Sequence, residues 1–137
     1  MEDLEKRTEA YGICGECNEP GTGDYWCQSC NAKRFKENFK NWTSENKDID
    51  ELIQHSQLNA VYCEKCLEWI PFEKFQNVEY ITRGGFGKIY SAYWPEGCIN
   101  YWDIKNQKWK RFSRKVALKS LDNSSDISTN FLNEVIE

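Results

Sequence analysis

The first part of the chain has the hydrophobic period of helices. Aromatic side chains recur at i, i+4 and i+7 within residues 31–42, so Phe35, Phe39 and Trp42 share one helical face, with lysine and arginine side chains on the other. Because this spacing repeats at the helical period, we interpret the stripe as core rather than as a ligand-binding box.

Residues 43–47 break this pattern, and a second helix is expected over residues 49–58. Asp48 is interpreted as its N-cap, because Glu51 three residues later completes a capping-box pair. The single histidine, His55, has no serine, cysteine or carboxylate constellation beside it in the sequence, so we expect a surface or packing role.

From residue 78 onward the pattern changes to strands and turns. Residues 78–81 are rich in β-forming side chains, three glycines follow within residues 84–87, and residues 88–94 alternate as a second strand. A short apolar run over residues 116–119 ends in Lys119 and predicts a third strand. A strand, a glycine turn, a strand and a lysine-bearing strand together form a cradle suited to nucleotide phosphates.

Composition narrows the class of protein. The 137 residues suffice for one domain or two small ones, and 15% of them are aromatic, which excludes a disordered composition. A net charge of −4 gives no general indication of nucleic acid or membrane as partner. No run approaches the length of a membrane helix, and the charged residues 1–10 predict a short, frayed helix rather than a signal peptide. We expect the cytoplasm, with the nucleus as the alternative.

Seven cysteines, an odd count arranged largely as CxxC pairs, favour reduced thiols and metal over disulfides. Two such pairs are separated by nine residues, and the four thiolates they supply can surround one Zn²⁺ tetrahedrally: Cys14, Cys17, Cys27 and Cys30. Four cysteines close the coordination shell, so zinc would be structural. The alternative is four thiols without metal. A nucleic-acid role is disfavoured, because no dense basic cluster with interleaved aromatics flanks the pairs.

A third CxxC pair, Cys63 and Cys66, has no companion pair. Tyr62 and residues 67–70 around it resemble a partly buried strand that leads toward the next unit. We interpret the two thiols as part of a core segment, with an extra metal or redox site as the alternative.

The glycine turn differs from two other phosphate-binding motifs. A dinucleotide-binding loop opens a helix, whereas residues 88–94 alternate as a strand. A Walker loop needs glycine and Ser/Thr at positions that Thr82 and Ile89 occupy. The remaining alternative is a glycine-rich hairpin with an unrelated surface lysine.

Residues 78–137 resemble the N-lobe of eukaryotic protein kinases. Gly84 and Gly87 match the second and third glycines of that family's loop, and Val116-Ala117-Leu118-Lys119 matches its lysine strand. The resemblance implies an ATP site formed by Ile81, Gly84, Gly85, Phe86, Gly87, Ile89, Ala117 and Lys119. It also implies that residues 131–135 begin a helix whose Glu134 pairs with Lys119, with Mg²⁺ joining ATP only in an intact kinase.

The chain departs from the family pattern in three respects. Thr82 replaces the first glycine. About twenty residues, 95–115, separate the second and third strands, and residues 101–111 look like an added hairpin that turns near Asn106. This basic hairpin, residues 101–115, is either a protein-partner surface or a solvated hairpin. The catalytic H-R-D and D-F-G motifs do not occur, so no catalytic residue is assigned and the chain is expected to be inactive as a truncated kinase.

The whole arrangement resembles kinase-like proteins of arbuscular mycorrhizal fungi, which join a Cys-rich segment, an N-F-x-N-W-T-like helix (residues 38–43), an L-E-W-I-P strand (residues 67–71) and a kinase domain. The predicted fold class is α+β, a four-cysteine zinc knuckle with helices followed by an incomplete kinase N-lobe. The expected parts are 1–10, 11–43, 44–77 and 78–137. The alternative function is a zinc-dependent adaptor or pseudokinase-like binding module without nucleotide chemistry.

Overall fold

The protein is seen here as a computed structural model, which describes residues 4–85, 87–121 and 131–135. The chain divides into two compact units. The first contains Met1–Trp69 and Ile99–Lys110, and the second contains Ile70–Cys98 and Arg111–Glu137. Helices, an antiparallel sheet and a cysteine cluster confirm the α+β class.

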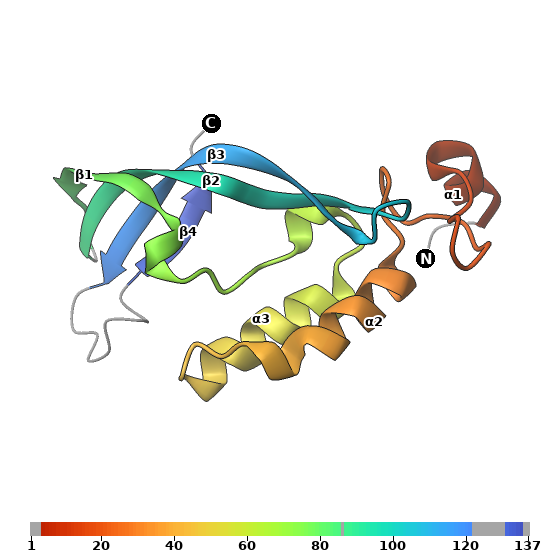
Figure 1. The fold of residues 1–137 in the computed structure, drawn as a ribbon, viewed down its shortest axis with the longest axis horizontal. Helices are drawn as coiled ribbons and strands as arrows, with labels where there is room; N and C mark the ends of the chain where they lie inside the picture. Colours follow the sequence, from red (N-terminus) through yellow and green to blue (C-terminus); the bar gives the residue numbers. More distant parts are fainter. Residues whose placement is uncertain (1–3, 86, 122–130, 136–137) are drawn as a thin grey trace. The chain divides into compact units, whose positions relative to one another are not determined.

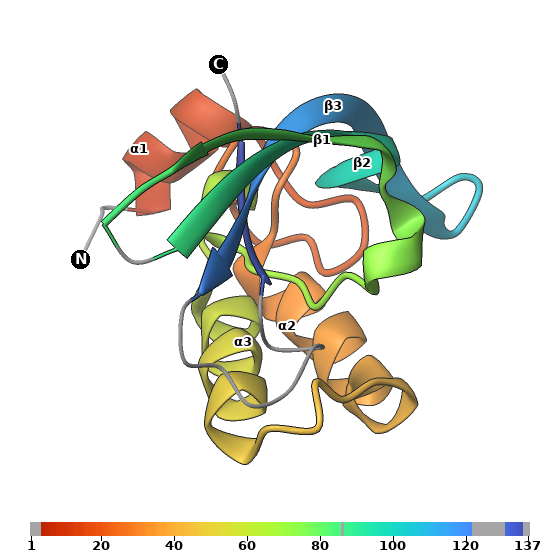
Figure 2. The ribbon, with the colours of Figure 1, turned by 90° about the vertical axis from the view of Figure 1, so that its left-hand side faces the viewer.

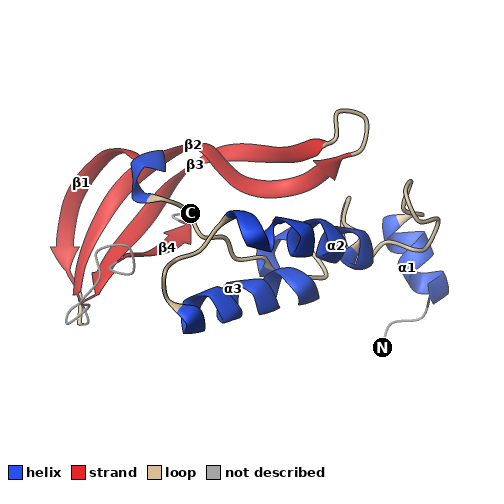
Figure 3. Cartoon of the chain, turned by 60° about the horizontal axis from the view of Figure 1, so that its bottom comes forward, coloured by secondary structure: helices blue, strands red, loops and turns tan. Residues whose placement is uncertain are grey.

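Three helices belong to the first unit: α1 (Leu4–Tyr11), α2 (Gln28–Asn38) and α3 (Lys47–Asn59). Helix α2 continues as a 3₁₀ turn over Phe39–Asn41. Helices α2 and α3 lie side by side (Figures 1 and 3). Both helices predicted from the aromatic and capping patterns are thus confirmed, with boundaries shifted by a few residues.

The N-cap of α3 is Asn46, and the prediction of Asp48 was wrong. Asn46 has the extended backbone of a cap residue, and its side-chain oxygen accepts a hydrogen bond from the Asp48 N–H at 3.0 Å. Asp48 already lies inside the helix. The side chain that bonds to the segment before the helix is Asp50, not the predicted Glu51. The Asp50 carboxylate accepts hydrogen bonds from the backbone N–H and the hydroxyl of Ser44.

The core of the first unit is aromatic. Phe35 is 4% exposed, and its ring lies 5.0 Å from that of Trp109 in a stacked arrangement. The other buried members of this cluster are Trp26, Ala60 and Ile99, with Phe39, Cys63 and Cys66 packed against it. The predicted core role of the stripe is confirmed for Phe35 and Phe39.

The segment after α3 is not the strand that the sequence suggested. It contains 3₁₀ turns at Cys63–Lys65 and Phe72–Lys74. Helix α3 satisfies the Leu67 backbone in place of a strand neighbour: Gln57 donates to its carbonyl at 2.9 Å, and Ser56 accepts from its N–H at 3.0 Å. A backbone paired in this way has no need of a β-ladder.

Four strands form one sheet in the order β1-β2-β3-β4 (Figure 2). Their bounds are Gln76–Arg83, Gly87–Asp103, Lys108–Leu121 and Phe131–Val135. The core of the second unit lies against this sheet and consists of Phe75, Ala92, Trp94, Val116 and Leu118. Strand β1 is exposed along its whole length.

Strands β2 and β3 are longer than predicted, and no separate hairpin is inserted between them. Residues 95–103 continue β2 to Asp103, and β3 begins at Lys108. The predicted turn near Asn106 is confirmed, because the Asp103 carboxylate accepts hydrogen bonds from the backbone and the side-chain N–H of Asn106. The basic hairpin is therefore the tip of the β2–β3 hairpin itself.

The segment around Glu134 is a strand, and the predicted helix is wrong. Strand β4 pairs antiparallel with β3, in a register that sets Glu134 opposite Ala117 and Leu132 opposite Lys119. Phenylalanine and valine favour strands, and pairing with β3 satisfies the backbone of this segment. The loop expected at residues 122–125 lies outside the described residues.

Candidate metal centre and glycine hairpin

The first cysteine pair lies in a tight turn closed by backbone hydrogen bonds. The Cys14 N–H donates to the Glu19 carbonyl at 2.8 Å, and the Asn18 N–H donates to the Cys14 carbonyl at 3.0 Å. Asn18 adopts the left-handed conformation, with φ 61°, which asparagine tolerates better than most residues. This turn holds Cys14 and Cys17 at the ends of a short knuckle.

The second pair lies at the start of α2. Cys27 is the N-cap residue, with an extended backbone at φ −121°, and Cys30 follows in the first turn of the helix. Cys30 therefore lies at the start of the helix that carries Phe35. A bridge between Gly23 and Trp26 forms the short turn that leads into this pair.

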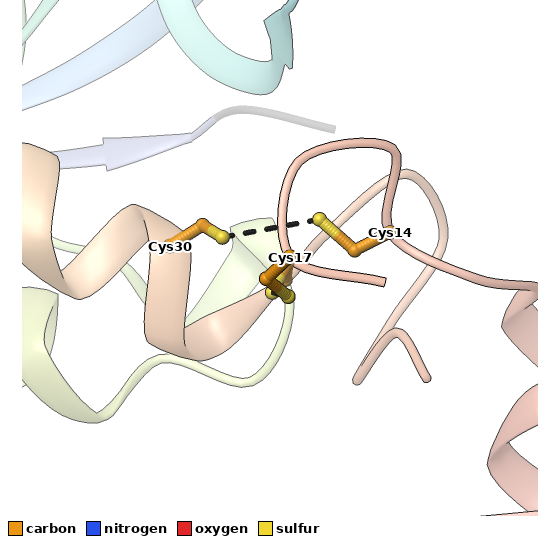
Figure 4. A group of neighbouring side chains, drawn as sticks. Cys14, Cys17 and Cys30 are labelled. Carbon is orange, nitrogen blue, oxygen red and sulfur yellow. Dashed lines mark hydrogen bonds between the residues drawn. The ribbon is translucent and has the colours of Figure 1, made fainter. Parts of the chain in front are cut away.

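The four sulfurs come together, and all of their ligand atoms lie within 4.8 Å of one another. The Sγ–Sγ distance is 3.9 Å for Cys14–Cys30 (Figure 4) and 3.7 Å for Cys17–Cys27. A zinc tetrahedron with bonds of about 2.3 Å has sulfur–sulfur edges of about 3.8 Å. These four cysteines are therefore close enough to bind one metal ion, and their distances are far longer than a disulfide bond.

The electrostatics of the cluster favour a cation at its centre. Burial raises the pKa of the Cys27 thiol, but hydrogen bonds from the Cys30 backbone N–H and the Ser29 hydroxyl outweigh burial and bring it to about 7. Burial and the neighbouring Cys27 raise the pKa of Cys30. Four thiolates this close repel one another, so full ionisation requires a positive ion between them.

Long-range hydrogen bonds fix the cysteine loops in place. Arg7 of α1 donates to the carbonyls of Pro20 and Gly21, at 2.8 Å and 3.1 Å. The buried indole N–H of Trp26 donates to the Ala60 carbonyl at 2.9 Å. The loop between the two cysteine pairs is therefore anchored from both sides by residues that lie far away in the sequence.

The glycine turn joins β1 to β2, as predicted. The Gly84 N–H donates to the Gly87 carbonyl at 2.7 Å, which closes the turn. A side-chain carbon built at Gly85 would have no atom within 4 Å, and one at Gly84 would lie 3.3 Å from the Ile89 Cδ1. Phe86 lies outside the described residues.

The other predicted nucleotide residues lie on the same sheet. Ile81 is exposed near the end of β1, whereas Ala117 and Lys119 are half-buried on β3. They alternate with Val116 and Leu118, which are almost fully buried. The alternation sets Ala117 and Lys119 on the face of β3 opposite to the core. The structure thus carries the predicted residues on neighbouring strands of one sheet.

Two further sequence candidates have structural surroundings. His55 is exposed on α3, and its carbonyl accepts a hydrogen bond from the Asn59 side chain at 2.9 Å. Cys63 and Cys66 pack against the aromatic core of the first unit. The metal-ligand groupings among the described residues do not include this pair.

Sequence reasoning missed a cavity of about 360 Å³ beside the cysteine cluster. Five of its fifteen lining residues are aromatic, and Cys14 and Cys27 also line it. The residues that form it come from α1, the cysteine loops, α2 and the tip of the β2–β3 hairpin. Sequence offers a weak signal at most, an excess of tyrosine and tryptophan, because these segments meet only in the folded unit.

Comparisons with models of protein families, with curated proteins and with solved structures give no match for this chain. Among the described residues, none of the helices has the length and apolar character needed to cross a bilayer.

Proposed function

We propose that the second unit binds ATP in the manner of a protein-kinase N-lobe. The observation that carries this proposal is the arrangement of a glycine turn between two antiparallel strands with Lys119 on the third strand. Backbone N–H groups of a glycine turn can approach phosphate oxygens closely, and a lysine ammonium meets phosphate as a point charge.

The glycines themselves support this assignment. Gly84 and Gly85 are not among the described residues with positive φ, and Gly85 has open space around it. Neither backbone conformation nor internal packing explains glycine at position 85. The open space would allow a ligand to approach the backbone closely at this position.

Glu134 keeps its proposed role as partner of Lys119, now from a strand. In the β3–β4 register it stands opposite Ala117, two positions along β3 from Lys119. The 137 residues contain no H-R-D or D-F-G motif, so they supply nucleotide binding without the catalytic base.

The test is the melting temperature of the purified chain with and without millimolar Mg²⁺-ATP. ATP at about 100 times its Kd would stabilise the protein by about 2.7 kcal/mol. Lys119→Ala should abolish that shift, whereas Lys115→Ala, an exposed lysine on the same strand, should retain it. Nucleotide binding at this site would be refuted if ATP left the melting temperature of the wild-type protein unchanged. It would also be refuted if Lys119→Ala kept the ATP-dependent shift.

For the cysteine cluster we propose one structural Zn²⁺ held by Cys14, Cys17, Cys27 and Cys30. Zinc prefers four-coordinate thiolate sites with this sulfur spacing, and four protein ligands leave no open position for catalysis. Elemental analysis should find one zinc per chain, lost in Cys14→Ser and retained in Cys98→Ser. Freshly purified protein without zinc would contradict the assignment.

The second candidate function is a zinc-dependent adaptor that binds a partner through the first unit. The cavity beside the cysteine cluster and the exposed lysines of the hairpin tip favour it. The ATP experiment distinguishes between the two proposed functions. An adaptor without nucleotide chemistry gives no ATP-dependent shift in any variant, yet still requires zinc.

A further inference from the structure

The cavity of the first unit has the composition of a binding site. Tyr11, Tyr25, Tyr101 and Trp102 supply aromatic walls, and its volume of about 360 Å³ lies within the range of small-ligand pockets. The rings of Tyr25 and Tyr101 lie 5.5 Å apart and inclined to each other. Such rings present electron-rich faces, which attract cations.

Tyr25 exposes its ring to solvent although its backbone conformation is unfavourable. Its side chain is 83% exposed, and its backbone is left-handed at φ 55°. A bulky residue in this conformation costs about 1–3 kcal/mol, and such strain clusters at functional sites. Neither hydrophobic burial nor backbone preference explains a tyrosine here.

Three residues that line the cavity also have buried polar atoms without hydrogen-bond partners among the described residues. Asn31 is 2% exposed, and its Oδ1 has no hydrogen-bond partner among the described residues. The same holds for the buried Nε of Arg34 and the indole Nε1 of Trp102. A buried orphan acceptor costs about 1–3 kcal/mol, which a ligand that donates a hydrogen bond would recover. The two orphan donors suit a carbonyl, such as one of a peptide backbone.

The charges that line the cavity are negative in sum. Arg34 is the one cation among the lining residues, and it is already engaged: it pairs with both oxygens of Glu16 and lies 4.4 Å from the centre of the Trp102 ring. Asp103 has no cation paired with it in a salt bridge among the described residues. Hydrogen bonds from the Asn106 side chain and backbone lower the pKa of its carboxyl. Four thiolates around the proposed divalent ion would add further negative charge.

We propose that this cavity binds the primary ammonium group of a lysine side chain presented by a partner protein. The aromatic faces and Asp103 attract the charge, Asn31 accepts one of its hydrogen bonds, and the orphan donors receive a carbonyl of the partner's backbone. A lysine ammonium fits better than a guanidinium, because the Trp102 face and Glu16 already hold the guanidinium of Arg34. The inference needs the first unit folded with its metal and is independent of ATP.

The experiment is an NMR or tryptophan-fluorescence titration of the zinc-loaded chain with an acetylated, amidated pentapeptide that has one central lysine. Two matched peptides replace the lysine by norleucine, which is neutral, and by trimethyl-lysine, which cannot donate a hydrogen bond. We expect saturable binding of the lysine peptide and a Kd at least about tenfold higher for the norleucine peptide. The trimethyl-lysine peptide should bind more weakly than the lysine peptide.

Variants of the exposed residues locate the site without disturbing the core. Tyr25→Ala should raise the Kd about tenfold, and Tyr25→Phe, which keeps the ring, should leave it nearly unchanged. Asp103→Asn keeps an acceptor for Asn106 and should raise the Kd a few-fold, with a weaker dependence on salt. Tyr80→Ala, an exposed tyrosine of the second unit, is the control and should have no effect.

Four results would overturn the proposal, and three of them are equal affinity for lysine and norleucine peptides, an unchanged Kd in Tyr25→Ala, and no saturable binding at millimolar peptide. Tighter binding of trimethyl-lysine would exclude the hydrogen bond to Asn31 and the primary ammonium with it. If ATP does not change the melting temperature but the peptide titrations give the expected results, the nucleotide proposal is refuted and the lysine-binding proposal stands.

Discussion

The two units hold their candidate residues in different ways. In the first, the four cysteines are already gathered, and hydrogen bonds from Arg7 and Trp26 anchor the loop between the two pairs. In the second, the glycine turn adjoins β1, all eight of whose residues are exposed, and a side chain at Gly85 would meet open space. Contacts within the chain therefore hold the four sulfurs together, whereas the glycine turn has open space beside Gly85.

The largest expected effect is removal of the metal. Structural zinc contributes about 10–16 kcal/mol of apparent binding free energy in small domains, so a strong chelator should unfold the first unit. Circular dichroism should show loss of helical signal with EDTA and its recovery on adding zinc. Affinity should fall at acidic pH, because the thiols must lose protons to bind. If the helical signal persisted after chelation, the metal would not be needed to fold the first unit.

A pair of glycine variants tests the second unit next. Gly97 has φ 74°, and a side-chain carbon there would lie 1.4 Å from the Phe112 carbonyl oxygen. Gly97→Ala should therefore cost more than about 3 kcal/mol of unfolding free energy, since strain and clash act together. Gly85→Ala should change stability by less than about 1 kcal/mol yet weaken ATP binding. Urea denaturation with and without ATP measures both, and equal destabilisation by the two variants would contradict the assignment.

A smaller effect is expected when one anchor of the cysteine loops is lost. Trp26→Phe keeps an aromatic ring in the core but leaves the buried Ala60 carbonyl without its donor. Stability should fall by about 1–3 kcal/mol, and zinc affinity should fall with it. Trp42→Phe, a half-buried tryptophan of the same unit, is the matched control. An unchanged zinc affinity would show that this anchor does not hold the metal loops.

The smallest effect concerns the start of α3 and depends on pH. Burial opposes ionisation of Asp50, but hydrogen bonds from Ser44 and Thr43 outweigh it and hold its pKa below the ordinary value. A depressed pKa stabilises the fold above the ordinary value, and this contribution is lost as pH falls through the lowered pKa. Asp50→Asn should cost about 1 kcal/mol at pH 7, and the cost should shrink as pH falls through the lowered pKa. A cost independent of pH would exclude the carboxylate as its cause.

Local spacing predicted those parts of the molecule that local physics determines. The two cysteine pairs, the aromatic helix face and the glycine turn each depend on residues a few positions apart. The cap at Asn46 was missed because asparagine and aspartate cap helices almost equally well, and both occur here within three residues. Strand β4 was missed because its state depends on pairing with β3, which short-range periodicity does not show.

The cavity is the feature that the sequence could least predict. Tyr25 and Tyr101 meet only because the hairpin tip belongs with the cysteine loops in one unit. The orphan oxygen of Asn31 is likewise invisible in the sequence, since it follows from which neighbours fail to reach it. Residues that act through non-local contacts therefore need the fold, whereas metal ligands at fixed spacing do not.

The irregular pairing of β1 has a consequence for handling the protein. Its register with β2 shifts between Gln76 and Glu79 and again between Tyr80 and Thr82, and Asn77 is left-handed at φ 53°. Such bulges twist an outer strand and discourage a second molecule from extending the sheet. Deleting Asn77 would straighten this margin and promote fibrous self-association at high concentration. Shortened versions of the protein for crystallisation should therefore keep both register shifts intact.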